Sequence, residues 1–94
     1  MLMTEHARIR MSQRAIKADD INIALVYGEK KRSHGRYQYI LTDRAIARSP
    51  FIRRVDRLRG LCVIVDTSSC IITVKWLFDV RHHPGILRKQ RLVA

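Results

Sequence analysis

The sequence predicts an α+β domain in which two N-terminal helices pack on a small antiparallel sheet and a basic tail follows. Residues 4–28 repeat apolar side chains at helical spacing. Residues 61–65 and 71–77 are β-branched, nearly continuous apolar runs on either side of a short polar turn. Ninety-four residues with 47% hydrophobic content suit one small domain with a modest core.

The first predicted helix covers residues 4–17. Thr4 suits a helix N-cap, and Glu5 follows where a negative charge favours the helix dipole. On the helical wheel, a polar stripe lies between two apolar arcs, so we expect its side chains at the rim of a packed surface. The stripe consists of His6, Arg10, Arg14 and Lys17, and the arcs consist of Ala7, Met11 and Ala15 and of Ile9 and Ile16.

A second helix is predicted to begin at Ala18. The acidic pair Asp19 and Asp20 occupies its first turn, and Gly28 stops it. Its apolar face consists of Ile21, Ala24 and Leu25. We expect this helix to supply core and little chemistry.

The middle of the chain combines basic and aromatic residues. Residues 29–36 fit either a basic loop or the exposed rim of a strand. Residues 37–41 alternate as a strand that places Tyr37 and Tyr39 on one face. Two tyrosines beside basic residues suit a base-stacking platform, and they suit the packed face of a sheet equally well.

Residues 42–59 predict a basic helical insertion between strands. A short helix over residues 42–47, capped by Thr42 or Asp43, ends before Ser49-Pro50. Pro50 then starts another helix, whose arginines we expect to point outward. They are Arg53, Arg54, Arg57 and Arg59.

The last two strands read as a hairpin that turns at residues 67–69 and forms the centre of the sheet. Thr73 and Lys75 point together from the otherwise apolar second strand. Cys62 and Cys70 fall about 13 Å apart along the hairpin, too far for a disulfide, so we expect free thiols. The domain is predicted over residues 1–80, with a basic tail over residues 81–94 that contains no acidic residue.

The formal charge of +11 favours polyanionic partners, RNA or DNA first. An acidic protein surface is the alternative partner. No segment approaches the ~20 apolar residues of a membrane span and no signal sequence is evident, so a cytoplasmic protein without membrane contact is expected. The candidate nucleic-acid-binding residues are Lys17, Lys31, Arg32, Arg36, Tyr37, Arg53, Arg54 and Arg57.

Metal and cofactor sites are not predicted, since the histidines and cysteines lack ligand spacing and the four glycines are isolated. The chemistry that remains is His6 with Arg10 and Arg14 on one helical face. Imidazole exchanges protons near neutral pH, and guanidinium holds phosphate in a fork geometry. Together they suit RNA cleavage without metal, in which a base activates a 2′-hydroxyl and cations stabilise the phosphorane.

Residues 6–16, H-A-R-I-R-M-S-Q-R-A-I, resemble the signature H-A-x-x-R-M-x-x-R-x-I of a family of small bacterial domains of unknown function. Residues 71–74 resemble that family's closing I-x-T-V strand, and the resemblance extends over residues 4–76. Such domains resemble the barnase, EndoU, colicin and RelE-like nuclease fold, many of whose members are metal-independent ribonucleases and toxins. The resemblance implies His6, Arg10, Arg14 and Thr73 as site residues, with Met11 and Ile16 packing. The family has glycine where this chain has Ala15, a departure that favours a continued helix.

Three functional hypotheses follow. The first is a toxin-like, metal-independent endoribonuclease, in which His6 acts as base or acid, Arg10 and Arg14 clamp phosphate and Thr73 assists. The second is a non-catalytic RNA- or DNA-binding module that uses the same residues. The third is a structural domain whose cations meet an acidic partner such as an antitoxin.

Overall fold

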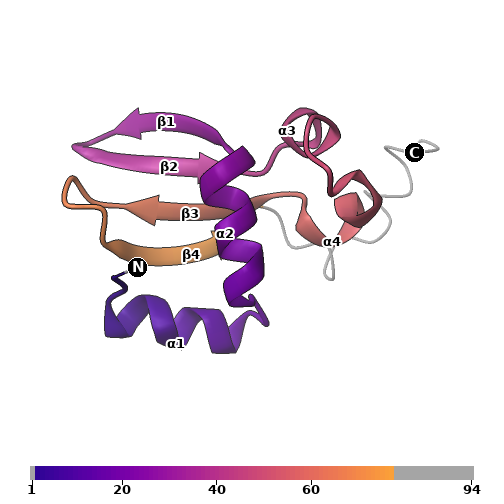
Figure 1. The fold of residues 1–94 in the computed structure, drawn as a ribbon. Helices are drawn as coiled ribbons and strands as arrows, with labels where there is room; N and C mark the ends of the chain where they lie inside the picture. The colour runs from indigo at the N-terminus through magenta and orange to yellow at the C-terminus, as the bar shows by residue number, and fades with distance from the viewer. Residues whose placement is uncertain (1, 78–94) are drawn as a thin grey trace.

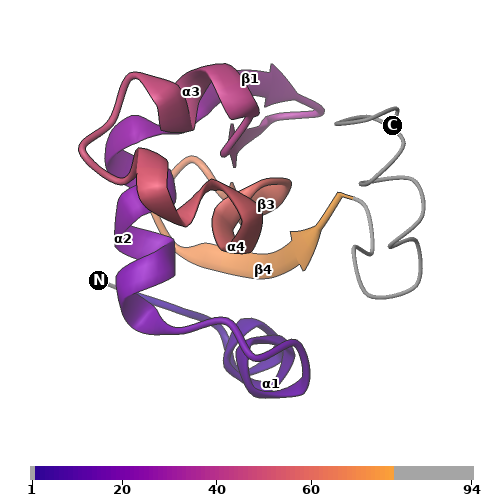
Figure 2. The ribbon, with the colours of Figure 1, turned by 90° about the vertical axis from the view of Figure 1, so that its right-hand side faces the viewer.

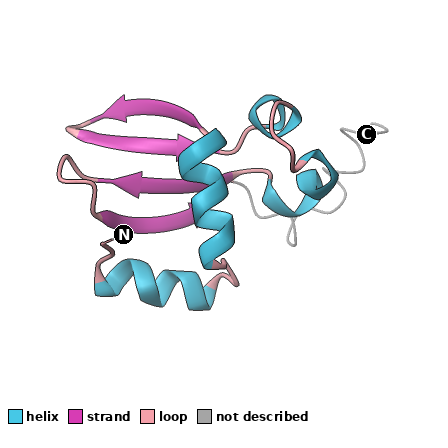
Figure 3. Ribbon diagram, viewed as in Figure 1, coloured by secondary structure: helices cyan, strands magenta, loops and turns pink. Residues whose placement is uncertain are grey.

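The computed structural model describes residues 2–77, and the predicted basic tail lies outside the described residues. Two helices, a hairpin, a helical insertion and a second hairpin follow one another along the chain (Figures 1 and 3). The elements are α1 Glu5–Gln13, α2 Ala18–Tyr27, β1 Glu29–Ser33, β2 Arg36–Ile40, α3 Asp43–Ala47, η1 Ile52–Arg54, α4 Val55–Leu58, β3 Leu61–Val65 and β4 Ile71–Trp76. The α+β class with two N-terminal helices and an antiparallel sheet is confirmed.

The four strands form an antiparallel meander in the order β1-β2-β3-β4 (Figure 1). Residues 29–36 are therefore an edge strand and its turn, and β1 pairs along its whole length with β2. Between β3 and β4 the register shifts, because Ile64 pairs with Thr73 whereas Val65 pairs with Ile71. Ile72 is thus the extra residue of a bulge near the start of β4.

One side of the sheet is covered by α2, and α1 lies along its β4 edge (Figures 1 and 2). The chain before α1 joins that edge, since Thr4 N–H donates to the Ile71 carbonyl at 2.9 Å. The Thr4 hydroxyl caps α1 by accepting from Ala7 N–H at 3.1 Å. These bonds cover the β4 edge and fix where α1 begins.

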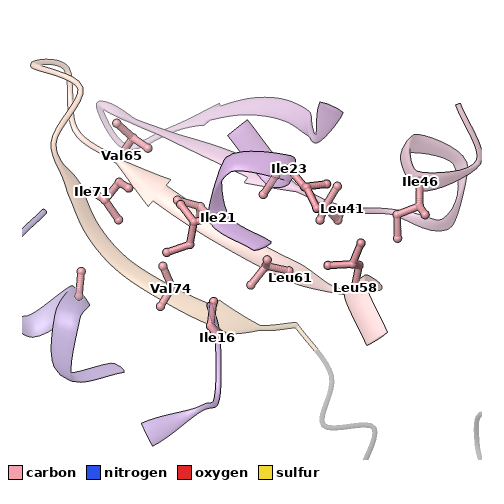
Figure 4. Packing of buried hydrophobic residues seen from close by; sticks show 13 residues of the cluster. Ile16, Ile21, Ile23, Leu41, Ile46, Leu58, Leu61, Val65, Ile71 and Val74 are labelled. Atoms are coloured by element: carbon pink, nitrogen blue, oxygen red, sulfur yellow. The ribbon is translucent and has the colours of Figure 1, made fainter. Parts of the chain in front are cut away.

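The core lies between the sheet and the helices (Figure 4). Ile21 and Ala24 of α2 pack over strand residues that all point to the same side. Those strand residues are Leu61, Val63, Val65, Ile71 and Val74. The insertion adds Ile46 and Leu58, both fully buried, at the end of the sheet.

The first helix is shorter than the sequence predicts. It ends at Gln13, and Ala15 adopts a left-handed conformation with φ of 54°. The expected continued helix is wrong, because the chain turns at Ala15 to bring Ile16 into the core. The second apolar arc is also wrong, since Ile9 remains 47% exposed. Lys17 lies beyond the turn, so it is not part of the polar stripe.

The insertion differs from the prediction in the direction of its arginines. Its short helix is capped by Thr42 as expected, and a 3-10 turn leads into α4. Arg57, however, forms an ion pair with buried Asp20 at 3.1 Å. The Arg59 side chain is only 12% exposed and pairs with Asp43. Outward placement is therefore wrong for Arg59, whereas the Arg57 side chain is 47% exposed and still pairs with a carboxylate of α2.

Two smaller predictions concern the thiols and helix length. Cys62 and Cys70 are free cysteines, as expected. No helix within residues 2–77 combines the length and apolar character needed to cross a bilayer.

Candidate nucleic-acid interface

The side of the sheet opposite α2 carries no helix among residues 2–77 (Figure 2). We call it the open face. Strand alternation and register place two rows of side chains across it. One row is Lys31, Gln38, Ile64 and Thr73, and the next is Glu29, Ile40, Cys62 and Lys75.

The open face carries a lysine at each edge, and Glu29 adds a carboxylate at the β1 edge. Lys31 stands on β1, and Lys75 stands on β4 two residues beyond Thr73. Between the charges lie half-buried Gln38, Ile64 and Thr73. Amide and hydroxyl groups beside ammonium groups can donate hydrogen bonds to phosphate oxygens.

α1 runs alongside β4 in the same direction. At its start, the Thr4 hydroxyl donates to the Ile72 carbonyl at 3.2 Å. At its end, the Arg14 carbonyl accepts from the Trp76 indole N–H at 3.2 Å. Thr73, the residue after Ile72, is therefore level with the first half of the helix.

The polar flank of α1 lies toward the open face. Ala7 is fully buried against the sheet edge, and Met11, about 40° to one side of it, packs on the core between the sheet and the helices. Arg10 lies about 60° from Ala7 on the other side of the helical wheel, and His6 lies beyond Arg10 on that side. Half-buried Arg14 is close to the contact line itself. The histidine and both arginines thus border the same face as Thr73 and Lys75.

The arginines of this flank are available for ligands. Arg10 Nη1 donates to Gln13 Oε1 at 3.1 Å, a neutral partner. Within residues 2–77, neither Arg10 nor Arg14 forms an ion pair. His6 is exposed and has no hydrogen-bond partner among those residues. A phosphate group at the flank would therefore displace no carboxylate.

The other predicted nucleic-acid-binding residues fall into separate regions. Lys31 and Arg36 lie on the open face. Arg32 and Tyr37 point to the opposite side of the β1–β2 hairpin, where Lys30 Nζ stands 4.5 Å from the Tyr37 ring centre. Tyr39 packs against the core, so the tyrosines belong to the helix-covered side of the sheet. Tyr37 and Tyr39 therefore do not form a stacking platform on the open face.

The remaining cations lie away from the open face. Lys17 precedes α2, and its backbone N–H donates to Asp20 at 3.0 Å. Arg53 and Arg54 belong to η1, where Arg54 stacks over Phe51 at 5.3 Å. Arg57 is occupied by Asp20. The predicted basic residues therefore do not lie on a single surface.

Sequence reasoning missed Lys75 as a site residue. The signal was its spacing of two from Thr73, which in a strand puts both side chains on one face. Its neighbour Cys62 does not add a nucleophile, because burial raises the pKa of that thiol despite the Lys75 charge nearby. The open face therefore offers cations, a hydroxyl, the imidazole at its α1 border and the Glu29 carboxylate as its chemical groups.

Among residues 2–77, no three histidine, cysteine or acidic side chains gather as metal ligands. Comparisons with protein-family models, with curated proteins and with solved structures found no match to this chain.

Proposed function

We propose that this protein is a metal-independent endoribonuclease that binds RNA across the open face of its sheet. The observation that carries the proposal is the polar flank of α1 beside β4. One imidazole, two guanidinium groups without carboxylate partners, a hydroxyl and an ammonium group border the same surface. The net charge of +11 adds a long-range attraction for RNA.

The proposed reaction is an internal transesterification of RNA. His6 transfers one proton, either from the 2′-hydroxyl as base or to the departing 5′-oxygen as acid, and solvent water makes the other transfer. The 2′-oxygen attacks phosphorus, the bond from phosphorus to the 5′-oxygen breaks, and a 2′,3′-cyclic phosphate and a 5′-hydroxyl end form. Arg10 and Arg14 stabilise the phosphorane charge, and Thr73 donates a hydrogen bond.

The resemblance of residues 6–16 and 71–74 to a family of small bacterial domains with a nuclease-like fold supports the same proposal. The same resemblance implies a toxin-like role inside a bacterial cytoplasm and an acidic antitoxin-like partner that covers the basic surface. Fold and motif do not by themselves establish activity. The enzyme must therefore be tested directly.

A non-catalytic RNA-binding module is the second candidate. The observation that favours it is the exposure of His6, which no group among residues 2–77 orients by a hydrogen bond. A general base is normally held by a neighbour, as in catalytic triads. The two candidates share their RNA surface and differ only in what His6 does.

Cleavage of labelled RNA in EDTA separates the candidates. We expect His6→Ala to lower the cleavage rate by about a hundredfold while RNA affinity changes little. Arg10→Ala should reduce both, because a phosphate clamp acts in the ground state and the transition state. His34→Ala, in the β1–β2 turn, and Arg8→Ala, on the outer side of α1, are matched controls. Intact RNA with the wild type on several substrates would favour the binding module, and full-rate cleavage by His6→Ala would overturn the catalytic role of His6.

A further inference from the structure

A hollow of about 580 Å³ opens at the end of the sheet, where β2 leads into α3 and β4 ends. Its apolar lining comes from Ile40, Leu41 and Leu77. Its polar lining comes from Glu29, Thr42, Asp43, Arg44 and Arg59. A cavity of this size, apolar with a few placed polar groups, is typical of small-ligand sites.

Glu29 is held rigidly at the wall of this hollow. Its Oε2 accepts from the Thr42 hydroxyl at 2.7 Å and from Arg44 Nε at 3.3 Å. The Thr42 hydrogen bond, aided by the Arg44 charge, lowers the pKa of the carboxyl, so it is ionised near neutral pH. Oε1 has no hydrogen-bond partner among residues 2–77. A fixed, ionised acceptor is therefore available to a ligand.

The hollow continues the open face. Glu29 and Ile40 occupy the same row as Cys62 and Lys75. Three inter-strand steps, about 14 Å in all, separate Glu29 from Lys75 at the α1 edge. Ile40 and Cys62 between them are buried, so a short RNA segment that reaches both the polar flank of α1 and the hollow would cross the neighbouring, half-buried row.

We infer that this hollow is a nucleobase subsite that selects bases bearing an exocyclic amine. The inference rests on the proposed function, since RNA is the source of the base. The strongly basic protein favours an anionic ligand, whereas the carboxylate at the wall needs a hydrogen-bond donor. A nucleotide of guanine, adenine or cytosine supplies both, the phosphate charge and an amine for Glu29 Oε1.

Uracil is disfavoured in the same position. Its only ring N–H lies between two carbonyl oxygens, which the ionised carboxylate repels. Ile40, Leu41 and Leu77 provide apolar surface against the base in every case. Arg44 is paired with Glu29 and so brings little net charge, but its side chain is 68% exposed and its remaining N–H groups can donate hydrogen bonds to the phosphate. Glu29 therefore discriminates among the bases, and the other groups provide affinity for all four nucleotides.

The test uses the full chain and the four nucleoside monophosphates, titrated while amide NMR signals are followed. We expect the three amine-bearing nucleotides to bind about tenfold more tightly than uridine monophosphate, as one hydrogen bond to a charged acceptor provides. The amides of Thr42 and Gly60, at the hollow, should shift. Equal affinity for all four nucleotides, or no shift at these amides, would overturn the subsite.

Glu29→Gln is the decisive variant, because an amide of the same size donates as well as accepts and so also accommodates uracil. We expect the preference to fall below about threefold. Asp19→Asn, an exposed site on α2 with the same charge change, should keep it. Leu77→Trp, at a 47% exposed position, should fill the hollow and weaken binding of all four nucleotides. A preference that survives in Glu29→Gln overturns the inference.

The outcomes of this experiment distinguish the subsite from the ribonuclease proposal. Base preference in a protein that leaves RNA intact would support the subsite and overturn the catalytic role of His6. Cleavage that depends on His6, without any base preference, would overturn the subsite alone.

Discussion

The arginines of α1 and those of the insertion between β2 and β3 differ in what their guanidinium groups contact. On α1, Arg10 and Arg14 form no ion pair within residues 2–77. In the insertion, two arginines bind carboxylates from other parts of the fold, and a third binds carboxylates of the insertion itself. The pairs are Arg44 with Glu29, Arg57 with Asp20, and Arg59 with Asp43 and Asp56.

The difference shows that the density of arginine along the chain does not indicate which guanidinium groups are paired with carboxylates. A guanidinium already paired with a carboxylate offers little net charge to phosphate, and it serves to hold elements together. The sequence is richest in arginine within the insertion, yet half of the six arginines there are paired with carboxylates. The predictions below test this division between structural and ligand-binding arginines.

The largest expected effect is on stability at the Asp20–Arg57 pair. The Asp20 side chain is 2% exposed, and its Oδ1 has no hydrogen-bond partner within residues 2–77. Arg57→Ala leaves this buried carboxylate with one backbone N–H, from Lys17. We expect a loss of about 3 kcal/mol in the free energy of unfolding, measured by urea denaturation.

Arg53→Ala is the control for that measurement, because Arg53 is exposed and forms no ion pair within the described residues. Its effect should stay within about 0.5 kcal/mol. A loss of less than about 1 kcal/mol in Arg57→Ala would show that the buried pair does not hold α4 to α2.

The next effect is on RNA affinity at α1. The double variant Arg10→Gln and Arg14→Gln should weaken RNA binding about tenfold or more. The slope of log affinity against log salt should fall by about two, one for each lost phosphate contact. Filter binding at several salt concentrations gives both values.

A double variant of equal charge change, Arg8→Gln with Arg53→Gln, tests whether position matters. Arg8 lies on the outer side of α1 and pairs with Glu5 at 3.6 Å. If affinity depends on net charge alone, both double variants will weaken binding equally, and the proposed flank is not the binding surface.

A smaller effect is expected at the turn after α1. Ala15 has φ of 54°, a conformation that costs an L-residue about 1–2 kcal/mol and costs glycine little. Ala15→Gly should therefore raise the free energy of unfolding by about 1 kcal/mol in thermal or urea melts. Ala47→Gly, at an exposed helical position of α3, should lower it. Destabilisation by Ala15→Gly would mean that the turn is held by contacts that glycine loses.

Elements with local signals were predictable from the sequence. Thr42 caps α3, Gly28 ends α2, and the β3–β4 hairpin turns where polar residues interrupt two apolar runs. These features depend on neighbours within a few residues. Periodicity also gave the correct face for Tyr37 and Tyr39, although not what covers that face.

Long-range pairings were not predictable in the same way. Arg57 and Asp20 are 37 residues apart, and an exposed arginine has the same local pattern as a paired one. The end of α1 was missed because Ala15 carries no local signal for a turn. The candidate site depends on a contact between residues 68 apart, Thr4 and Ile72, which sets α1 beside Thr73. The sequence indicates the residue types of the site, and the fold decides which share a face.

The smallest expected effect concerns acid stability, and it extends the comparison from the arginines to the carboxylates. Asp66 Oδ1 accepts from Cys70 N–H and Ser68 N–H, both at 2.9 Å, and from the Ser68 hydroxyl. The Cys70 N–H contributes most to holding the pKa of Asp66 below its ordinary 3.8. A carboxyl whose pKa is lower in the folded state stabilises the fold above its unfolded pKa, and this stabilisation is lost as the pH falls.

Urea denaturation from pH 6 to pH 3 should therefore show stability falling below about pH 4. Asp66→Asn keeps an acceptor oxygen at the turn and removes the titration, so its stability should depend less on pH, whereas exposed Asp19→Asn should follow the wild type. If Asp66→Asn loses stability as steeply as the wild type, then other carboxylates, such as those paired with the insertion's arginines, control acid unfolding.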